Sequence, residues 1–422
     1  MSRSQTVTLN TTLTRARLPS LAGLRWVAAV GVFMYHATGP FMFPTTVFPE
    51  AVPFALRNVG GSGLSFFFIL TGFLLTWSAR PKDTKGRFWL RRFVRLYPNH
   101  LITLAIMVVL LDFTHLLPYR AQATGVWQSV LLVHAWSPDP FVMIGANAVS
   151  WSLSVDAFFL LLFPFWLKLL NRIRPDRLWY YAAGVFGLML LVPFIAAQLP
   201  SQPMLPDALI GRPTSAWQWW LVYDSPLTRC LECFLGSLAA RLLLHGKLPA
   251  LRLRYVLPVV AGVYAFSIFF LPINFYGIVL VLAPPMLLLT VALTQADIRG
   301  QRTVLNHPVL VWLGGVSYAF YLLHRIVLEV FISGFGAKVP WTIPTAIAAL
   351  VALLGLTTGL AYLLYILVER PMLRRFSPPD PTGRPDTKGQ FIPVSVDYSL
   401  RRAGPEHVRR RDALGGKENP AA

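Results

Sequence analysis

Two ionisable residues share one apolar segment near the start of the chain. Arg25 and His36 stand eleven positions apart within residues 21–38. In a helix this spacing puts both side chains on nearly the same face, roughly 16 Å apart along the axis. A charged residue at mid-membrane costs about 2.5–3.5 kcal/mol, so ionisable groups in such segments usually serve function. An apolar setting favours neutral imidazole, the form a general base requires. The alternative is an interfacial arginine and a hydrogen-bonded core histidine.

A second group is the basic segment Arg87–Pro98. Arg92 and Arg95 lie three positions apart, with Arg91 beside them, at the predicted start of a helix. Guanidinium groups at this spacing suit a polyphosphate, because each binds phosphate oxygens in a bidentate manner. The alternative is ordinary positive charge on the cytoplasmic side of a membrane.

A carboxylate follows in the segment Trp151–Pro164. Asp156 lies one turn after Ser152, and the predicted topology puts it near the outer side, the half toward which His36 points. There it could orient the imidazole as the third member of a catalytic triad does. The competing interpretation is a helix-capping or interfacial aspartate.

Two further polar groups lie inside apolar segments. Arg229 and Glu232, at i, i+3, favour an intramembrane ion pair. Ser317, Tyr321 and His324, at i, i+4, i+7, form a polar stripe on one helix face. Hydrogen bonding inside a bundle explains the stripe, and a donor pathway or substrate groove is the alternative.

The elements that position these residues are transmembrane helices. The 422 residues are 55% hydrophobic and only 13% charged, against about 25% charged residues in soluble proteins. Apolar stretches near 20 residues recur, which indicates an all-α, polytopic transmembrane bundle. The predicted spans are residues 21–39, 62–79, 97–113, 150–170, 178–199, 226–245, 255–272, 276–295, 308–332 and 343–368.

The net charge of +20 follows the topology of these ten spans. Lys and Arg concentrate in alternate connections, so the positive-inside rule puts both termini in the cytoplasm. Topology thus explains the charge, and nucleic-acid binding is not expected. Residues 126–136 are predicted to form a short interfacial or re-entrant piece, because a further crossing would move the basic 171–177 loop outside. We expect a cytoplasmic tail at 1–19, the membrane domain at 20–370, and a disordered basic cytoplasmic tail at 371–422.

Cys230 and Cys233 form a C-x-x-C within a predicted span, without partner ligands. Buried small apolar side chains are the preferred interpretation, and no metal site is predicted.

Together these segments resemble the membrane-bound acyltransferase family 3. The first-span Arg/Lys and His signature matches Arg25 and His36, and the RxxR element matches Arg92 and Arg95. The WSLSVE-type segment matches Trp151 to Asp156, with Asp in place of Glu. The SYxxYLxH-like stretch matches Ser317, Tyr318, Tyr321, Leu322 and His324. The resemblance covers residues 20–370.

The resemblance implies a bacterial cell-membrane enzyme that moves an acyl group from acyl-CoA to a hydroxyl. The acceptor would be a carbohydrate or a sugar-bearing metabolite such as a macrolide. Arg92 and Arg95, with Arg25, would bind the CoA phosphates. His36 would deprotonate the acceptor or take the acyl group itself, and Asp156 would orient it. A transporter or channel, or an export scaffold without catalysis, are the alternatives.

Overall fold

The structure is a computed structural model that describes residues 17–38, 42–43, 47–48, 51–79, 83–113, 125–205, 214–269, 275–336 and 339–376. Within these ranges the regular structure is helical apart from an isolated bridge between Met204 and Ser215. This confirms the predicted all-α class. Most of the predicted tails, residues 1–16 and 377–422, lies outside the described residues.

Each predicted span corresponds to a helix. The ten helices are α2 (Pro19–Ala37), α3 (Ala51–Trp77), α4 (Lys85–Val108), α7 (Trp151–Arg172), α8 (Leu178–Ala196), α11 (Pro226–Leu244), α12 (Leu253–Phe269), α13 (Phe275–Ile298), α14 (Pro308–Gly334) and α15 (Ile343–Leu364). Seven described helices are long and apolar enough to cross a membrane, the exceptions among the ten being α2, α11 and α12. The count of ten spans and the side of the termini stay predictions.

Two helices differ from the predicted spans at functionally relevant ends. α4 begins at Lys85 rather than at residue 97, so the basic segment is helical. The Thr84 side chain accepts a hydrogen bond from the Arg87 backbone N–H and caps this extension. At the other end, η8 (Tyr365–Glu369) and α16 (Arg370–Phe376) continue α15 beyond the predicted boundary at 370. At both places, helical turns rich in charged residues extend the helix beyond its apolar segment.

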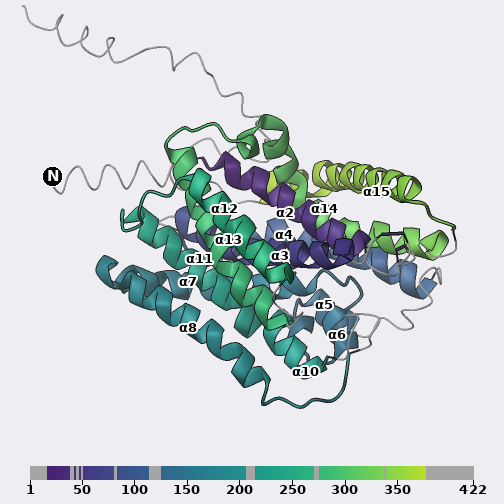
Figure 1. The fold of residues 1–422 in the computed structure, drawn as a ribbon, viewed down its shortest axis with the longest axis horizontal. Helices are drawn as coiled ribbons and strands as arrows, with labels where there is room; N and C mark the ends of the chain where they lie inside the picture. The colour runs from purple at the N-terminus through teal and green to yellow at the C-terminus, as the bar shows by residue number, and fades with distance from the viewer. Residues whose placement is uncertain are drawn as a thin grey trace, which may run out of the picture.

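Close helix contacts depend on small residues. α2 packs between α3 and α14, and α11 packs on α3; Figure 1 shows α2 in the middle of the molecule. A Cβ on Gly72 of α3 would lie 1.7 Å from the Cys233 carbonyl oxygen, and one on Gly314 of α14 would lie 2.0 Å from the Ala22 carbonyl oxygen. These helices approach to backbone contact, as is typical of membrane bundles.

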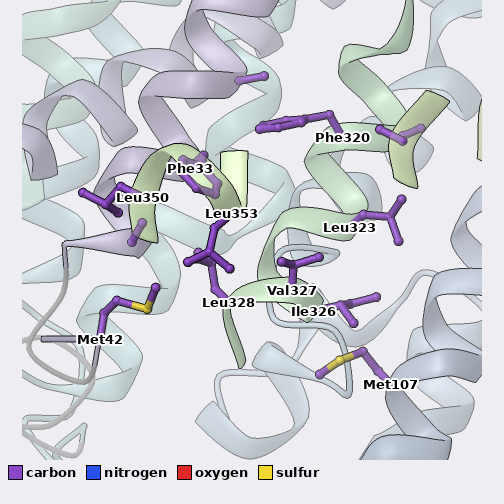
Figure 2. Packing of buried hydrophobic residues seen from close by; sticks show 14 of the residues in the cluster. Phe33, Met42, Met107, Phe320, Leu323, Ile326, Val327, Leu328, Leu350 and Leu353 are labelled. Carbon is purple, nitrogen blue, oxygen red and sulfur yellow. The ribbon is translucent and has the colours of Figure 1, made fainter. Parts of the chain in front are cut away.

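An apolar cluster joins α2, α14 and α15. Phe33 of α2 packs with Phe320 and Leu328 of α14 and with Leu350 and Leu353 of α15 (Figure 2). The Phe33 ring lies 5.9 Å from Phe320 and 6.5 Å from His324, centroid to centroid. This packing fixes the rotation of α2 against α14, and with it the neighbours of His36.

Residues 126–136 form two short pieces, α5 (Val126–Val130) and η3 (His134–Trp136). Neither approaches the roughly 20 residues of a spanning helix, in agreement with the predicted short piece. α6 (Pro140–Ile144) follows. Hydrogen bonds join the connecting region to the bundle. The Asn147 side chain donates to the Leu322 carbonyl oxygen of α14 at 3.1 Å, and Ser154 Oγ of α7 donates to the Leu132 carbonyl oxygen at 2.5 Å.

Candidate active site

Six of the predicted site residues line one cavity of about 180 Å³. They come from four helices and are Arg25 of α2, Arg92 and Arg95 of α4, Ser152 and Asp156 of α7, and Tyr321 of α14. Leucine and phenylalanine side chains of α3 form much of the wall. Drug-sized ligands occupy pockets of roughly 300–1,000 Å³, so this cavity suits a narrow chain rather than a nucleotide.

The cationic side of the cavity is formed by α2 and α4. Arg92 and Arg95 are partly buried, and the Arg92 guanidinium lies 5.7 Å from the centre of the Phe88 ring. Glu369 of η8 is 3% exposed, accepts a hydrogen bond from Asn99 Nδ2 at 3.0 Å and interacts electrostatically with Arg95 and Arg25. Glu369 was not among the predicted site residues, although an acidic residue at the end of an apolar span could have indicated it.

Asp156 lies on the same cavity and interacts with Arg25. The structure therefore does not bring it to His36, and the predicted partnership of these two residues is wrong. The reason is the depth at which α7 starts. The segments between residues 125 and 150 occupy the space before α7, and Ser152 already lies level with Tyr321, in the middle of α14. The second turn of α7 then meets Arg25, in the first half of α2.

The Tyr321 hydroxyl is hydrogen-bonded within the wall of the cavity. It lies 2.9 Å from Ser152 Oγ and donates to the Val149 carbonyl oxygen at 3.1 Å. Ser317, one turn earlier on α14, also lines the cavity. Both hydroxyls of the predicted stripe therefore line this cavity.

His36 lies beside α14. Its Nδ1 is 3.5 Å from Nη1 of Arg325, and Arg325 Nε donates to Glu329 Oε1 at 2.6 Å. The His36 ring lies 5.4 Å from the His324 ring, centroid to centroid. Arg325 and Glu329 were not among the predicted site residues. They could have been found in the same way as Arg229 and Glu232, because they too are an Arg–Glu pair one helical turn apart in an apolar span.

His324 connects His36 to the cavity. Its Nδ1 donates to the Tyr321 carbonyl oxygen at 2.5 Å, and the His324 and Tyr321 rings lie 5.5 Å apart, centroid to centroid. His324 is fully buried. Tyr321 and His324 of α14 thus lie between the arginine-lined cavity and the imidazole of His36.

Arg229 and Glu232 form a separate, fully buried ion pair with 3.2 Å between Nη1 and Oε2, which confirms the preferred prediction for them. The Arg229 guanidinium also lies 4.8 Å from the centre of the Phe68 ring. Nearby Asp224 ends η5 (Trp220–Asp224), between two predicted spans, and is buried. Burial raises its pKa to about 8. Asp224 is therefore mostly neutral at pH 7, and Glu232 is the main counter-charge of Arg229.

Cys230 and Cys233 are free and buried, as predicted. Within the described part of the chain, no group of three or more His, Cys, Asp or Glu residues could hold a metal ion.

The arrangement combines a cationic cavity, hydroxyl groups along one helix and two neighbouring imidazoles. Such a set can bind an anionic chain at one end and move a proton at the other.

Comparison with known proteins agrees with this chemistry. A family model described as an acyltransferase domain matches residues 18–366. The acyltransferase MdmB of Streptomyces mycarofaciens is 35% identical over 374 residues, which cover 85% of this chain and 92% of that protein. No solved structure matches the chain.

Two more distant relatives are named as peptidoglycan O-acetyltransferases. The putative enzyme YrhL of Bacillus subtilis is 25% identical over 84% of this chain and 55% of its own length. OatA of Listeria monocytogenes is 27% identical over 40% of this chain and 27% of its own length. These relatives exclude the transporter and scaffold alternatives. The chain belongs to the membrane-bound acyltransferase family 3, and is a multi-pass O-acyltransferase of the cell membrane.

Proposed function

We propose that the protein transfers an acetyl or other short acyl group from acyl-CoA to a hydroxyl of a carbohydrate or of a sugar-bearing metabolite such as a macrolide. The main supporting observation is the cavity itself. Three arginines from two helices line it together, and Tyr321 connects it to the His324–His36 pair.

The arginines suit the donor. Arg92 and Arg95, which line the cavity, bind the CoA phosphates, because guanidinium groups pair with phosphate oxygens in a bidentate manner. Arg25, held by Asp156 and Glu369, adds positive charge at the same cavity. The pantetheine arm occupies the narrow cavity, and the thioester passes Ser317 and Tyr321 on α14 toward His36. Asp156 therefore acts on the donor side.

His36 is the proposed general base. Its imidazole takes the proton of the acceptor hydroxyl while the hydroxyl oxygen attacks the thioester carbonyl carbon. The C–S bond then breaks, and the proton passes from the imidazolium to the departing CoA thiolate. The products are the ester and free CoA. Arg325 lies beside His36. Its guanidinium is the proposed group that stabilises the developing oxyanion.

The acceptor proposal is supported by the names of two relatives, a peptidoglycan O-acetyltransferase and a putative one, since peptidoglycan contains glycan hydroxyls. A panel of acyl-CoA donors and hydroxyl acceptors, supplied to the protein in liposomes, identifies the acceptor from the mass of the product.

The base is tested with His36→Ala. General-base assistance is worth about 10²–10⁴-fold, so turnover measured as thiol release should fall by that factor with the protein still folded. Wild-type turnover of this variant would refute the mechanism.

The donor site is tested with Arg92→Ala and Arg95→Ala, with Arg91→Ala as the matched control. Arg91 is paired with Asp83 and does not line the cavity. The first two variants should raise KM for acyl-CoA, whereas with an acyl-pantetheine donor, which lacks the nucleotide, their KM should equal that of the wild type. Unchanged KM for acyl-CoA in both would remove the docking assignment.

A further inference from the structure

The second histidine of the site has a nitrogen that its surroundings do not use. His324 is fully buried, and its Nε2 has no hydrogen-bond partner among the described residues. Buried polar atoms are nearly always paired, and a catalytic role is one of the explanations of an exception.

The tautomer of His324 follows from its other nitrogen. Nδ1 lies 2.5 Å from the Tyr321 carbonyl oxygen, which can only accept a hydrogen bond. Nδ1 of the neutral ring therefore carries the proton, and the unpartnered Nε2 presents a lone pair.

The tautomer of His36 follows in the same way. A guanidinium can only donate, so where Arg325 Nη1 approaches His36 Nδ1 at 3.5 Å, Nδ1 is the acceptor. The proton of neutral His36 is then on Nε2. His36 thus has an N–H to donate, and His324 has a lone pair to receive it.

The His36 and His324 rings are close enough to form an N–H···N hydrogen bond. Their centroids are 5.4 Å apart and their planes are inclined by 37°. Two imidazoles joined by an N–H···N bond of about 2.9 Å have centroids on the order of 5 Å apart. A rotation of the partly buried His36 side chain therefore suffices to form the bond, whereas His324 is held by Tyr321 and stacks on Phe320.

We propose that His324 is a positioning residue for the transfer reaction: its Nε2 accepts the Nε2–H of His36 and keeps His36 Nδ1 unprotonated. The acceptor hydroxyl then replaces Arg325 Nη1 at His36 Nδ1, and the Arg325 guanidinium turns to the thioester carbonyl oxygen. This inference rests on the proposed role of His36 as base. When Nδ1 takes the hydroxyl proton, the hydrogen bond to His324 stabilises the imidazolium, as the carboxylate of a triad does. The proton leaves from Nδ1 to the CoA thiolate, so His324 returns to its starting state.

The test compares two substitutions that retain different properties of the histidine side chain. His324→Gln retains an acceptor oxygen, and His324→Phe retains the aromatic packing on Phe320 but has no acceptor. If His324 positions His36, kcat of the Phe variant should fall by about 10²-fold with KM for the donor unchanged, and the Gln variant should stay within about tenfold of wild type. Turnover is expressed per folded protein, with thermal unfolding measured for each variant.

A purely structural role predicts the reverse order, since phenylalanine preserves packing better than glutamine. Activity of His324→Phe equal to or above that of His324→Gln would overturn the inference. In the His36→Ala background, His324→Phe should cause no further loss, because it acts through His36. Loss of activity in His36→Ala together with full activity in His324→Phe refutes this inference alone, whereas an active His36→Ala variant refutes the proposed function as well.

Discussion

Removing one member of the Arg229–Glu232 pair should destabilise the bundle strongly, and removing both should not. Both side chains are fully buried, with 3.2 Å between Nη1 and Oε2. At that separation an effective dielectric constant of about 20 gives an attraction of about 5 kcal/mol. Because Asp224 is mostly neutral at pH 7, Arg229→Met leaves Glu232 as a buried charge without its partner, a change that typically costs about 3–5 kcal/mol.

The double variant Arg229→Met/Glu232→Leu removes the attraction and the desolvation of both charges together. Its free energy of unfolding should lie close to that of the wild type, because apolar replacements of buried ion pairs are often neutral. The assay is unfolding of the purified protein in mixed micelles, with the coupling energy taken from the double-mutant cycle. A double variant as unstable as Arg229→Met would refute the reasoning. A stable but inactive double variant would assign the pair to substrate binding instead.

Three other outcomes follow from the packing and hydrogen bonds. Gly72→Leu should lower the stability by at least about 1–3 kcal/mol, because its Cβ would meet the Cys233 carbonyl oxygen at 1.7 Å. Gly187→Leu is the control: an added Cβ there would meet nothing within 4 Å, so thermal unfolding of this variant should match the wild type. Tyr321→Phe should cost about 0.5–1.5 kcal/mol, because it removes the hydrogen bonds of the Tyr321 hydroxyl while Ser152 Oγ still donates to the Val149 carbonyl oxygen; wild-type stability would contradict this. Burial lowers the pKa of His134, in η3 between the predicted spans, from 6.5 to about 4, so the unfolded chain binds more protons at intermediate pH. Stability should therefore fall by about 2 kcal/mol as the pH drops from 6.5 to 5, and His134→Gln should lack this loss.

Much of the fold could be predicted because it is local. Whether a stretch is apolar and near 20 residues long is a property of the stretch itself, and all ten predicted spans are helices in the structure. Contacts within one helix were equally accessible. The 3.6-residue period places Arg229 beside Glu232 and Tyr321 beside His324 whatever the rest of the chain does.

The sequence by itself thus determined the helices, the class of enzyme through its motifs, and the residue pairs that share a helix. The tertiary structure decided which residues of different helices meet. The motifs predicted a partnership of Asp156 with His36, but the segments between 125 and 150 start α7 at the depth of Tyr321, and Asp156 meets Arg25 instead. Likewise His36 lies beside Arg325 and His324 because the packing of Phe33 against Phe320 and α15 sets the rotation of α2. The depth and rotation of one helix against another depend on contacts distant in sequence, and helix periodicity does not encode them.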